Sequence, residues 1–212
     1  MDSIGPERQP HLFTVGHSNH PLETFVALLQ KHKVQVLADI RSSPYSRYVK
    51  HFDREELEQS LQQADIEYLY LGKELGGRPD EDEFYDAEGL VLYYRLAESA
   101  TFLEGIHRLE QGIQRYRVAI MCSEENPAVC HRYLLVGRVV TRRGVKLSHI
   151  RGDGSLLPDS ELREEDFVQP TLFDGPEDSP WKSLRSVLRR KTPSSSSDSS
   201  ARMESSDSST CD

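Results

Sequence analysis

The sequence has few cysteines, no long apolar run and no excess of positive charge. Three cysteines among 212 residues do not indicate a disulfide framework, so a reducing compartment is expected. No segment reaches the roughly 18 consecutive apolar residues of a membrane helix, and the polar start MDSIGPERQP lacks the apolar core of a signal peptide. We therefore expect a cytoplasmic protein without a membrane partner.

The charge balance is acidic. The chain has 26 Lys and Arg side chains against 35 Asp and Glu, for a formal net charge of −9. Such a protein is not expected to coat nucleic acid or anionic lipid through bulk charge. Any site for an anion must therefore be local.

Short β-branched runs alternate with amphipathic stretches from residue 12 onward, which is typical of βα units around a parallel sheet. We predict one Rossmann-like α/β domain over residues 12–154, with three layers and a mostly parallel sheet of about five strands. The strands are expected at 12–16, 34–40, 66–71, 118–122 and 145–150.

Capping residues mark two helix starts. Asp53 with Glu56 matches a capping box. Asn126 followed by Pro127 predicts a helix that runs to about residue 143, with Cys130 in its first turn. Free N–H groups and the helix dipole would attract an anion there.

The segments outside the domain differ from it in composition. Residues 1–11 are expected to be flexible, and residues 155–179 form an acidic extension. Residues 180–191 predict a short basic helix, which would contact nucleic acid or an acidic partner, or dock on the acidic extension. The serine-rich residues 192–212 predict a disordered C-terminal tail.

Polar loops follow the first four predicted strands: GHSN, RSSPYSR, GKELGGR and SEENPAVCHR. The carboxyl ends of parallel strands meet at one edge of a sheet, where open α/β folds bind ligands. Four arginines on these loops, Arg41, Arg47, Arg78 and Arg132, predict a positive pocket for phosphate or another anion. Arg132 either reaches this pocket or pairs with a buried carboxylate such as Asp39.

The same loops hold candidates for catalysis. His17 and Glu124 are candidate proton-transfer groups, and Cys130 is a candidate nucleophile whose pKa a helix start and His131 would lower. Cys122 closes a buried strand, which is typical of a small core residue. The predicted substrate-binding residues are Ser18, Arg41, Ser42, Arg47, Arg78, His131 and Arg132.

We predict no metal ion and no cofactor. Zinc bound by Cys122, Cys130 and His131 would lack a fourth ligand, and the seven residues between the cysteines exceed the usual short spacing. The lysine of GKELGGR precedes the glycine pair, unlike that of a P-loop, and no G-x-G-x-x-G follows the first strand.

Five segments together resemble one known family. TVGHS, ADIRSSPYSR, YLYLGKELGGR, MCSEENPAVCHR and SHIRGDG occur in order over residues 12–154, as in the domain-of-unknown-function-488 family (DUF488). The resemblance implies an intracellular, mainly bacterial α/β domain and no assigned reaction. The residues that match by motif are His17, Ser18, Arg41, Ser42, Pro44, Gly76, Gly77, Arg78, Cys122, Glu124, Cys130, His131 and Arg132.

Three functions fit these patterns. The leading hypothesis is an enzyme that acts on a phosphate-bearing substrate, a nucleotide or nucleic acid, by hydrolysis or group transfer. The second is a non-catalytic module that binds a nucleotide or nucleic acid in DNA repair or replication. The third is a thiol redox protein that uses Cys122 and Cys130.

A short peptide in the acidic extension predicts a protein partner. Gln169, Leu172 and Phe173 lie in QPTLF, which resembles the peptides that dock bacterial repair proteins on the sliding clamp. Pro170 departs from that pattern, and the two apolar residues would alternatively pack on the domain.

Overall fold

The computed structural model of the chain describes residues 9–162 and 181–184. The predicted N-terminal segment up to residue 8, the extension from residue 163, most of the basic segment and the serine-rich tail lie outside the described residues. Within the described ranges, no helix is both long and apolar enough to cross a membrane.

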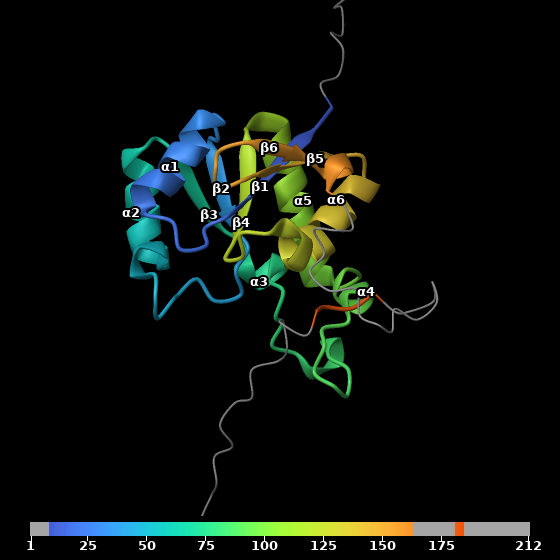
Figure 1. The fold of residues 1–212 in the computed structure, drawn as a ribbon. Coiled ribbons are helices and arrows are strands. Elements are labelled where there is room, and N and C mark those ends of the chain that lie inside the picture. The colour runs from blue at the N-terminus through green and yellow to red at the C-terminus, as the bar shows by residue number, and fades with distance from the viewer. Residues whose placement is uncertain (1–8, 163–180, 185–212) are drawn as a thin grey trace, which may run out of the picture.

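The centre of the domain is a six-stranded sheet with the order β3-β2-β4-β1-β5-β6 (Figure 1). The first five strands along the chain are parallel to their neighbours, and β6 pairs with β5 in the antiparallel direction. Their bounds are β1 His11–Gly16, β2 Val36–Asp39, β3 Glu67–Tyr70, β4 Val118–Cys122, β5 Lys146–Ile150 and β6 Leu156–Pro158.

Helices cover both faces of this sheet, so the domain has three layers (Figure 1). The α-helices are α1 Leu22–Lys31, α2 Arg54–Gln63, α3 Gly72–Leu75, α4 Tyr93–Leu96, α5 Ala100–Arg115 and α6 Arg138–Arg142. The short helices are η1 Lys50–Phe52, η2 Asp82–Phe84, η3 Pro127–Val129, the π-helical η4 Arg132–Gly137 and η5 Asp159–Glu161.

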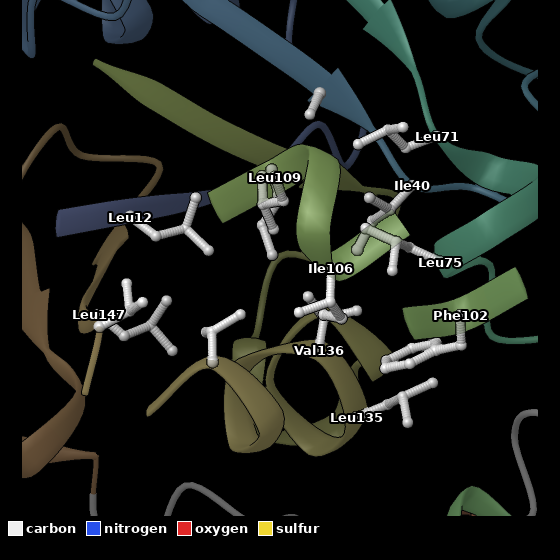
Figure 2. Packing of buried hydrophobic residues seen from close by; sticks show 14 of the residues in the cluster. Leu12, Ile40, Leu71, Leu75, Phe102, Ile106, Leu109, Leu135, Val136 and Leu147 are labelled. Carbon is white, nitrogen blue, oxygen red and sulfur yellow. The ribbon is translucent and has the colours of Figure 1, made fainter. Parts of the chain in front are cut away.

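Successive side chains of each buried strand enter different cores, because strand side chains alternate between faces. In β1, Leu12 packs with α5, η4 and α6, whereas Phe13 packs with α1 and α2. Figure 2 shows the first of these cores, where Leu12 of β1 and Ile40, which follows β2, face Ile106 and Val136 of the helices. Burial on both faces explains why these strands are continuous apolar runs.

The α/β class, the three layers and the mostly parallel sheet predicted from the sequence are confirmed. The sixth strand was not predicted. β6 has three residues and ends on Pro158, so it has neither the length nor the composition of an ordinary strand. Because β6 and η5 belong to the domain, its fold continues beyond the predicted boundary at residue 154.

The predicted continuous helix over 126–143 is wrong. Asn126 and Pro127 do begin a helix, and the Asn126 side chain accepts a hydrogen bond from the Ala128 N–H at 3.0 Å. That helix is only η3, and Cys130 then takes an extended conformation with φ −116° and ψ 142°. A second helical segment, η4 followed by α6, begins at Arg132.

The predicted capping box of α2 is half correct. Asp53 is the N-cap residue, and the flanking Phe52 and Leu57 are fully buried. Its carboxylate caps no helix N–H. It accepts a hydrogen bond from the Ser46 N–H at 2.6 Å and pairs with Lys50 instead.

Residues 181–184 have no regular secondary structure where the sequence predicted a basic helix. They pack on the domain. Trp181 donates its ring N–H to the Leu134 carbonyl at 2.8 Å, and Ser183 exchanges two hydrogen bonds with the backbone of Val91.

Candidate functional site

The loops that follow β1, β2 and β4 are joined at one edge of the sheet. The His17 N–H donates to the Cys122 carbonyl at 2.9 Å, and the Ser18 N–H donates to the Ser123 carbonyl at 2.9 Å. His131 reaches the third strand, with its Nε2 at 3.0 Å from the Ile40 carbonyl oxygen. The sequence therefore placed its candidate loops at the correct edge.

Four polar side chains from the β4 segment meet at this edge. The Oε2 atom of Glu124 lies 3.0 Å from the Cys122 sulfur and 3.1 Å from the Cys130 sulfur. The Nδ1 atom of His131 lies 3.4 Å and 3.9 Å from the same two sulfurs. We call these four residues the thiol cluster. Its two cysteines and His131 are buried, whereas Glu124 is exposed as a residue although its carboxylate points inward.

The extended conformation of Cys130 shapes the thiol cluster. Because η3 stops before it, Cys130 is not in the first turn of a helix, contrary to the prediction. Its sulfur is turned back toward β4 and also accepts a long hydrogen bond from the Arg132 N–H at 3.5 Å. The π-helical η4 starts at Arg132, and π-helical turns are frequent at functional sites.

The two thiols have opposite pKa shifts. Burial alone would raise both, but a hydrogen bond from Cys130 and the charge of His131 lower the pKa of Cys122 to about 6. Burial and the neighbouring Cys122 sulfur raise the pKa of Cys130. The sequence predicted a thiolate at Cys130 and treated Cys122 as a core residue. The pKa shifts instead favour the thiolate at Cys122.

His131 is held in one orientation. Its Nε2 faces the Ile40 carbonyl, which only accepts, so Nε2 carries a proton and Nδ1 faces the sulfurs. Burial opposes the charged ring, but Cys122 and Glu124 raise the pKa of His131 overall. A Cβ atom on Gly77 would lie 2.7 Å from the His131 ring, so the Gly76-Gly77 turn makes room for this side chain.

The Arg132 side chain is hydrogen-bonded to the protein backbone. It is fully buried, and its guanidinium donates to the backbone carbonyls of Glu124 and Glu125. It therefore holds the loop that carries the thiol cluster. Asp39, the carboxylate considered as its partner, pairs with another arginine. Gly16 allows the close approach, since a Cβ there would lie 2.0 Å from the Glu124 carbonyl oxygen.

Arg41 is the partner of Asp39. Its Nη2 lies 2.6 Å from the Asp39 carboxylate, and the same nitrogen donates to the Phe52 carbonyl at 2.8 Å. The Tyr68 hydroxyl also donates to Asp39 at 2.8 Å. This buried ion pair joins β2, β3 and the start of α2, so most N–H groups of Arg41 are directed at protein acceptors.

His17 is neutral at this site. Its Nδ1 donates to the Ser18 carbonyl at 2.8 Å, and its Nε2 faces the Arg41 guanidinium at 3.3 Å. Burial, followed by the charge of Arg41, lowers the pKa of His17 to about 4. The ring also stacks on Phe52 with centroids 4.4 Å apart. Both nitrogens are therefore engaged, and the thiol cluster does not include this predicted catalytic residue.

The other predicted binding residues surround the cluster. Ser42 accepts a hydrogen bond from the Arg78 N–H at 2.9 Å, and both residues are half-buried. Ser18 has a positive φ of 45° in the loop after β1. Arg47 is exposed on the loop after β2. The predicted partner-binding residues Gln169, Leu172 and Phe173 lie outside the described residues.

Sequence interpretation left Cys122 out of the candidate catalytic residues and did not consider Tyr93. Cys122 shares its loop with three polar residues of the matched motif, which is the pattern that distinguishes it from a core cysteine. Tyr93 of α4 is fully buried, and its hydroxyl has no hydrogen-bond partner among the described residues. Burial and the nearby cysteines raise its pKa. No motif surrounds Tyr93, so only the fold places it near the thiol cluster.

One comparison with known proteins gives a match. The family model described as "Domain of unknown function DUF488" matches residues 21–139, more than half of the chain. That range includes the thiol cluster, Arg41 and Arg78, and it begins after His17 and Ser18. No curated protein and no solved structure matches the chain.

Proposed function

The chain belongs to the DUF488 family, whose description states no function, and from that premise we propose that it is a metal-dependent enzyme acting on a phosphate-bearing substrate. Cys122, Cys130 and His131 bind the metal ion, and Glu124 is its exchangeable fourth ligand. Zn²⁺ is the preferred ion, because sulfur, imidazole nitrogen and carboxylate oxygen are its usual ligands in proteins.

The spacing of the four donor atoms carries this proposal. Bonds of about 2.3 Å to sulfur and about 2.0 Å to nitrogen or oxygen give a tetrahedron with edges of about 3.3–3.8 Å. The donor atoms of the two cysteines and His131 all lie within 4.8 Å of one another. The Glu124 oxygen lies 3.0–3.1 Å from both sulfurs, so the fourth ligand that the sequence appeared to lack is within reach.

The surroundings of His131 and Cys130 support the same proposal. A histidine that binds a metal through one ring nitrogen usually donates its other N–H to a carbonyl or carboxylate. His131 does this with the Ile40 carbonyl while its Nδ1 faces the sulfurs. The hydrogen bond from the Arg132 N–H to the Cys130 sulfur fits a thiolate ligand, which is rich in acceptor capacity.

Glu124 decides between a structural and a catalytic metal ion. Structural zinc sites have four permanent ligands, whereas catalytic sites keep one position for water or substrate. The two cysteines and His131 are buried, whereas Glu124 is exposed as a residue and turns its carboxylate inward to the sulfurs. Rotation of Glu124 toward solvent would open the fourth position without moving the loop that Arg132 holds.

The proposed reaction is hydrolysis of a phosphate ester. The oxygen of a water molecule forms a bond to phosphorus, and the bond between phosphorus and the leaving oxygen breaks. One proton of the water passes to the Glu124 carboxylate and then to the leaving oxygen. The metal ion would lower the pKa of the water and polarise a phosphoryl oxygen. Glu124 thus keeps the proton-transfer role that the sequence predicted.

Two rival functions use other features of the site. A non-catalytic nucleotide-binding module would rely on the arginines, but Arg41 and Arg132 donate mainly to protein acceptors. A thiol redox protein would oxidise Cys122 and Cys130, and such a disulfide would remove two metal ligands. Reduced thiols favour the cytoplasm under the metal proposal. Docking on a sliding clamp through Gln169, Leu172 and Phe173 stays a prediction.

Cobalt binding to the full chain tests the proposal. Reduced protein is titrated with Co²⁺, and we expect one equivalent to give thiolate-to-cobalt charge-transfer absorption and tetrahedral ligand-field bands. Cys122→Ser and His131→Gln should each weaken binding strongly. Cys211→Ser is the matched control, since it removes a thiol that is not one of the four proposed ligands and should leave the spectrum unchanged.

Each result has a defined meaning. Absence of one-equivalent binding by the reduced protein would overturn the metal centre. If Glu124→Gln still binds cobalt but loses all phosphodiesterase and phosphomonoesterase activity, Glu124 is an exchangeable catalytic ligand. If wild type holds the metal but hydrolyses neither class of ester, the ion is structural and the enzymatic part of the proposal is wrong.

A further inference from the structure

The loop between β2 and α2 exposes two tyrosines and a cation. Tyr48 is 93% exposed and Tyr45 is 55% exposed, and no other large hydrophobic residue in the described part of the chain is as exposed as Tyr48. Arg47 between them is also exposed and makes no hydrogen bond or ion pair within the described residues. We call residues 43–50 the tyrosine loop.

The charge of this region contrasts with that of the whole chain. Residues 43–50 contain two cations, Arg47 and Lys50, and no acid, in a protein of net charge −9. Lys50 pairs with Asp53 but its side chain remains 72% exposed. The tyrosine loop therefore offers a local positive surface, which an acidic protein would otherwise lack.

Both ends of the tyrosine loop are fixed beside the thiol cluster. At its start, Ile40 accepts the hydrogen bond of His131, and the next residue is Arg41. At its end, Phe52 accepts a hydrogen bond from Arg41 and stacks on His17. The loop thus leaves the sheet beside the proposed metal centre and returns to Arg41 and His17, while its tyrosines stay exposed.

We infer that the tyrosine loop binds single-stranded nucleic acid and leads it to the proposed metal centre. This inference names the substrate class of the proposed function. It rests on the proposed function only for the claim that the bound strand leads to the metal centre. Exposed aromatic rings stack on unpaired bases, and a neighbouring arginine or lysine binds the backbone phosphates. Paired bases present no free faces, so a duplex does not satisfy the tyrosines.

Fluorescence anisotropy with the full chain tests this inference. The probes are short labelled single-stranded DNA and RNA oligonucleotides and the corresponding DNA duplex, with protein that is either zinc-loaded or treated with a chelator. We expect single strands to bind more tightly than the duplex. Tyr48→Ala should weaken binding by about fivefold to a hundredfold, the range for loss of one stacked base.

Arg47→Ala tests the phosphate contact. It should weaken binding to all sequences similarly and reduce the salt dependence of binding by about one phosphate contact. Tyr116→Ala is the matched control, because Tyr116 is 51% exposed but follows α5, away from the tyrosine loop. Its affinity for the oligonucleotide should equal that of wild type.

The outcomes separate this inference from the metal proposal. Equal binding by Tyr48→Ala and wild type, no binding of any strand, or equal affinity for duplex and single strand would each overturn the inference. Binding of a poly-glutamate peptide as tightly as the oligonucleotide would show simple charge attraction and overturn it too. If chelator-treated protein binds single strands, and reduced protein without chelator binds no cobalt, the inference about the tyrosine loop stands and the proposed metal centre is wrong.

Discussion

At the scale of single residues, Asp39 is expected to contribute to stability through a buried ion pair. It is completely buried and accepts hydrogen bonds from Arg41 and Tyr68. Asp39→Asn would leave the buried Arg41 charge without its counter-ion, so we expect a loss of about 3–5 kcal/mol in the free energy of unfolding. Chemical denaturation measures this loss.

Tyr68→Phe is the control for Asp39. It removes one hydrogen bond to the same carboxylate and should cost about 1–2 kcal/mol. Equal, small losses for Tyr68→Phe and Asp39→Asn would mean that the ion pair contributes little beyond its hydrogen bonds.

His17 should make stability depend on pH. Its pKa is near 6.5 in an unfolded chain and is lowered to about 4 in the folded protein by burial and by Arg41. Below pH 6.5 the unfolded chain gains a proton that the folded chain does not, so the free energy of unfolding falls as the pH falls toward 4. One such group contributes about 3 kcal/mol over that range.

His17→Gln removes this titration while it can still accept a hydrogen bond from Arg41. The free energy of unfolding of chelator-treated wild type and variant is measured by denaturation from about pH 7 to about pH 4, which covers the shift in the His17 pKa. The variant should lose less stability with acid. Parallel curves would show that His17 is not held neutral.

At the scale of structural elements, the turn between α3 and Arg78 controls the position of His131. A Cβ at Gly77 would lie 2.7 Å from the His131 ring, so Gly77→Ala should displace the ring and weaken cobalt binding by about 10-fold to 100-fold. Gly112→Ala is the control, because its Cβ would meet its nearest neighbour at 3.7 Å. Unchanged cobalt affinity in Gly77→Ala would separate this turn from the centre.

The segment 181–184 should stabilise the domain although it has no regular structure. Trp181 packs edge-on against Tyr93, and Arg138 lies over its ring at 4.9 Å. A chain that ends at residue 180 should therefore lose about 1–3 kcal/mol and melt at a lower temperature than a chain that ends at residue 184. Calorimetry compares the two. Identical melting would mean that these contacts contribute no stability.

The sequence predicted regular elements well and their interruptions poorly. The strand Val118–Cys122 has the predicted bounds because an apolar run ends there at a polar loop. The helix from Asn126 was predicted as continuous, because periodicity over Val129, Tyr133 and Val136 does not register the extended Cys130 between η3 and η4. A backbone break at one residue leaves little trace in a pattern of apolar positions.

The sequence also could not predict which groups the charged side chains pair with. Four loop arginines were predicted to share one anion pocket, but the structure pairs Arg41 with Asp39 through packing between β2 and β3, which the sequence does not reveal. Tertiary packing likewise turned Cys130 toward Cys122 and brought Glu124 between them. The candidate site was therefore predictable as a location, while its chemistry required the fold.

At the scale of the whole molecule, metal binding should be coupled to folding. The proposed ligands lie in the β4 loop, and His131 also contacts β2, so the site exists only when these elements are assembled. An ion bound only by the folded chain stabilises it by about 2.7 kcal/mol at a free concentration 100 times the dissociation constant.

Thermal unfolding with added zinc measures this coupling. The melting temperature of wild type should rise with zinc and return to its initial value with a chelator. Cys122→Ser should show no rise. A rise of the same size in Cys122→Ser would place the stabilising ion elsewhere on the chain.

The exposure of Glu124 has a consequence for the lifetime of a bound ion. Three of the four proposed donors, Cys122, Cys130 and His131, are buried, so we expect them to separate only when the protein unfolds locally. The carboxylate is attached through rotatable bonds at the surface. Side chains rotate within nanoseconds, whereas local unfolding takes microseconds or longer. Under the metal proposal, Glu124 would therefore admit incoming molecules quickly, while the ion would stay bound over many such encounters.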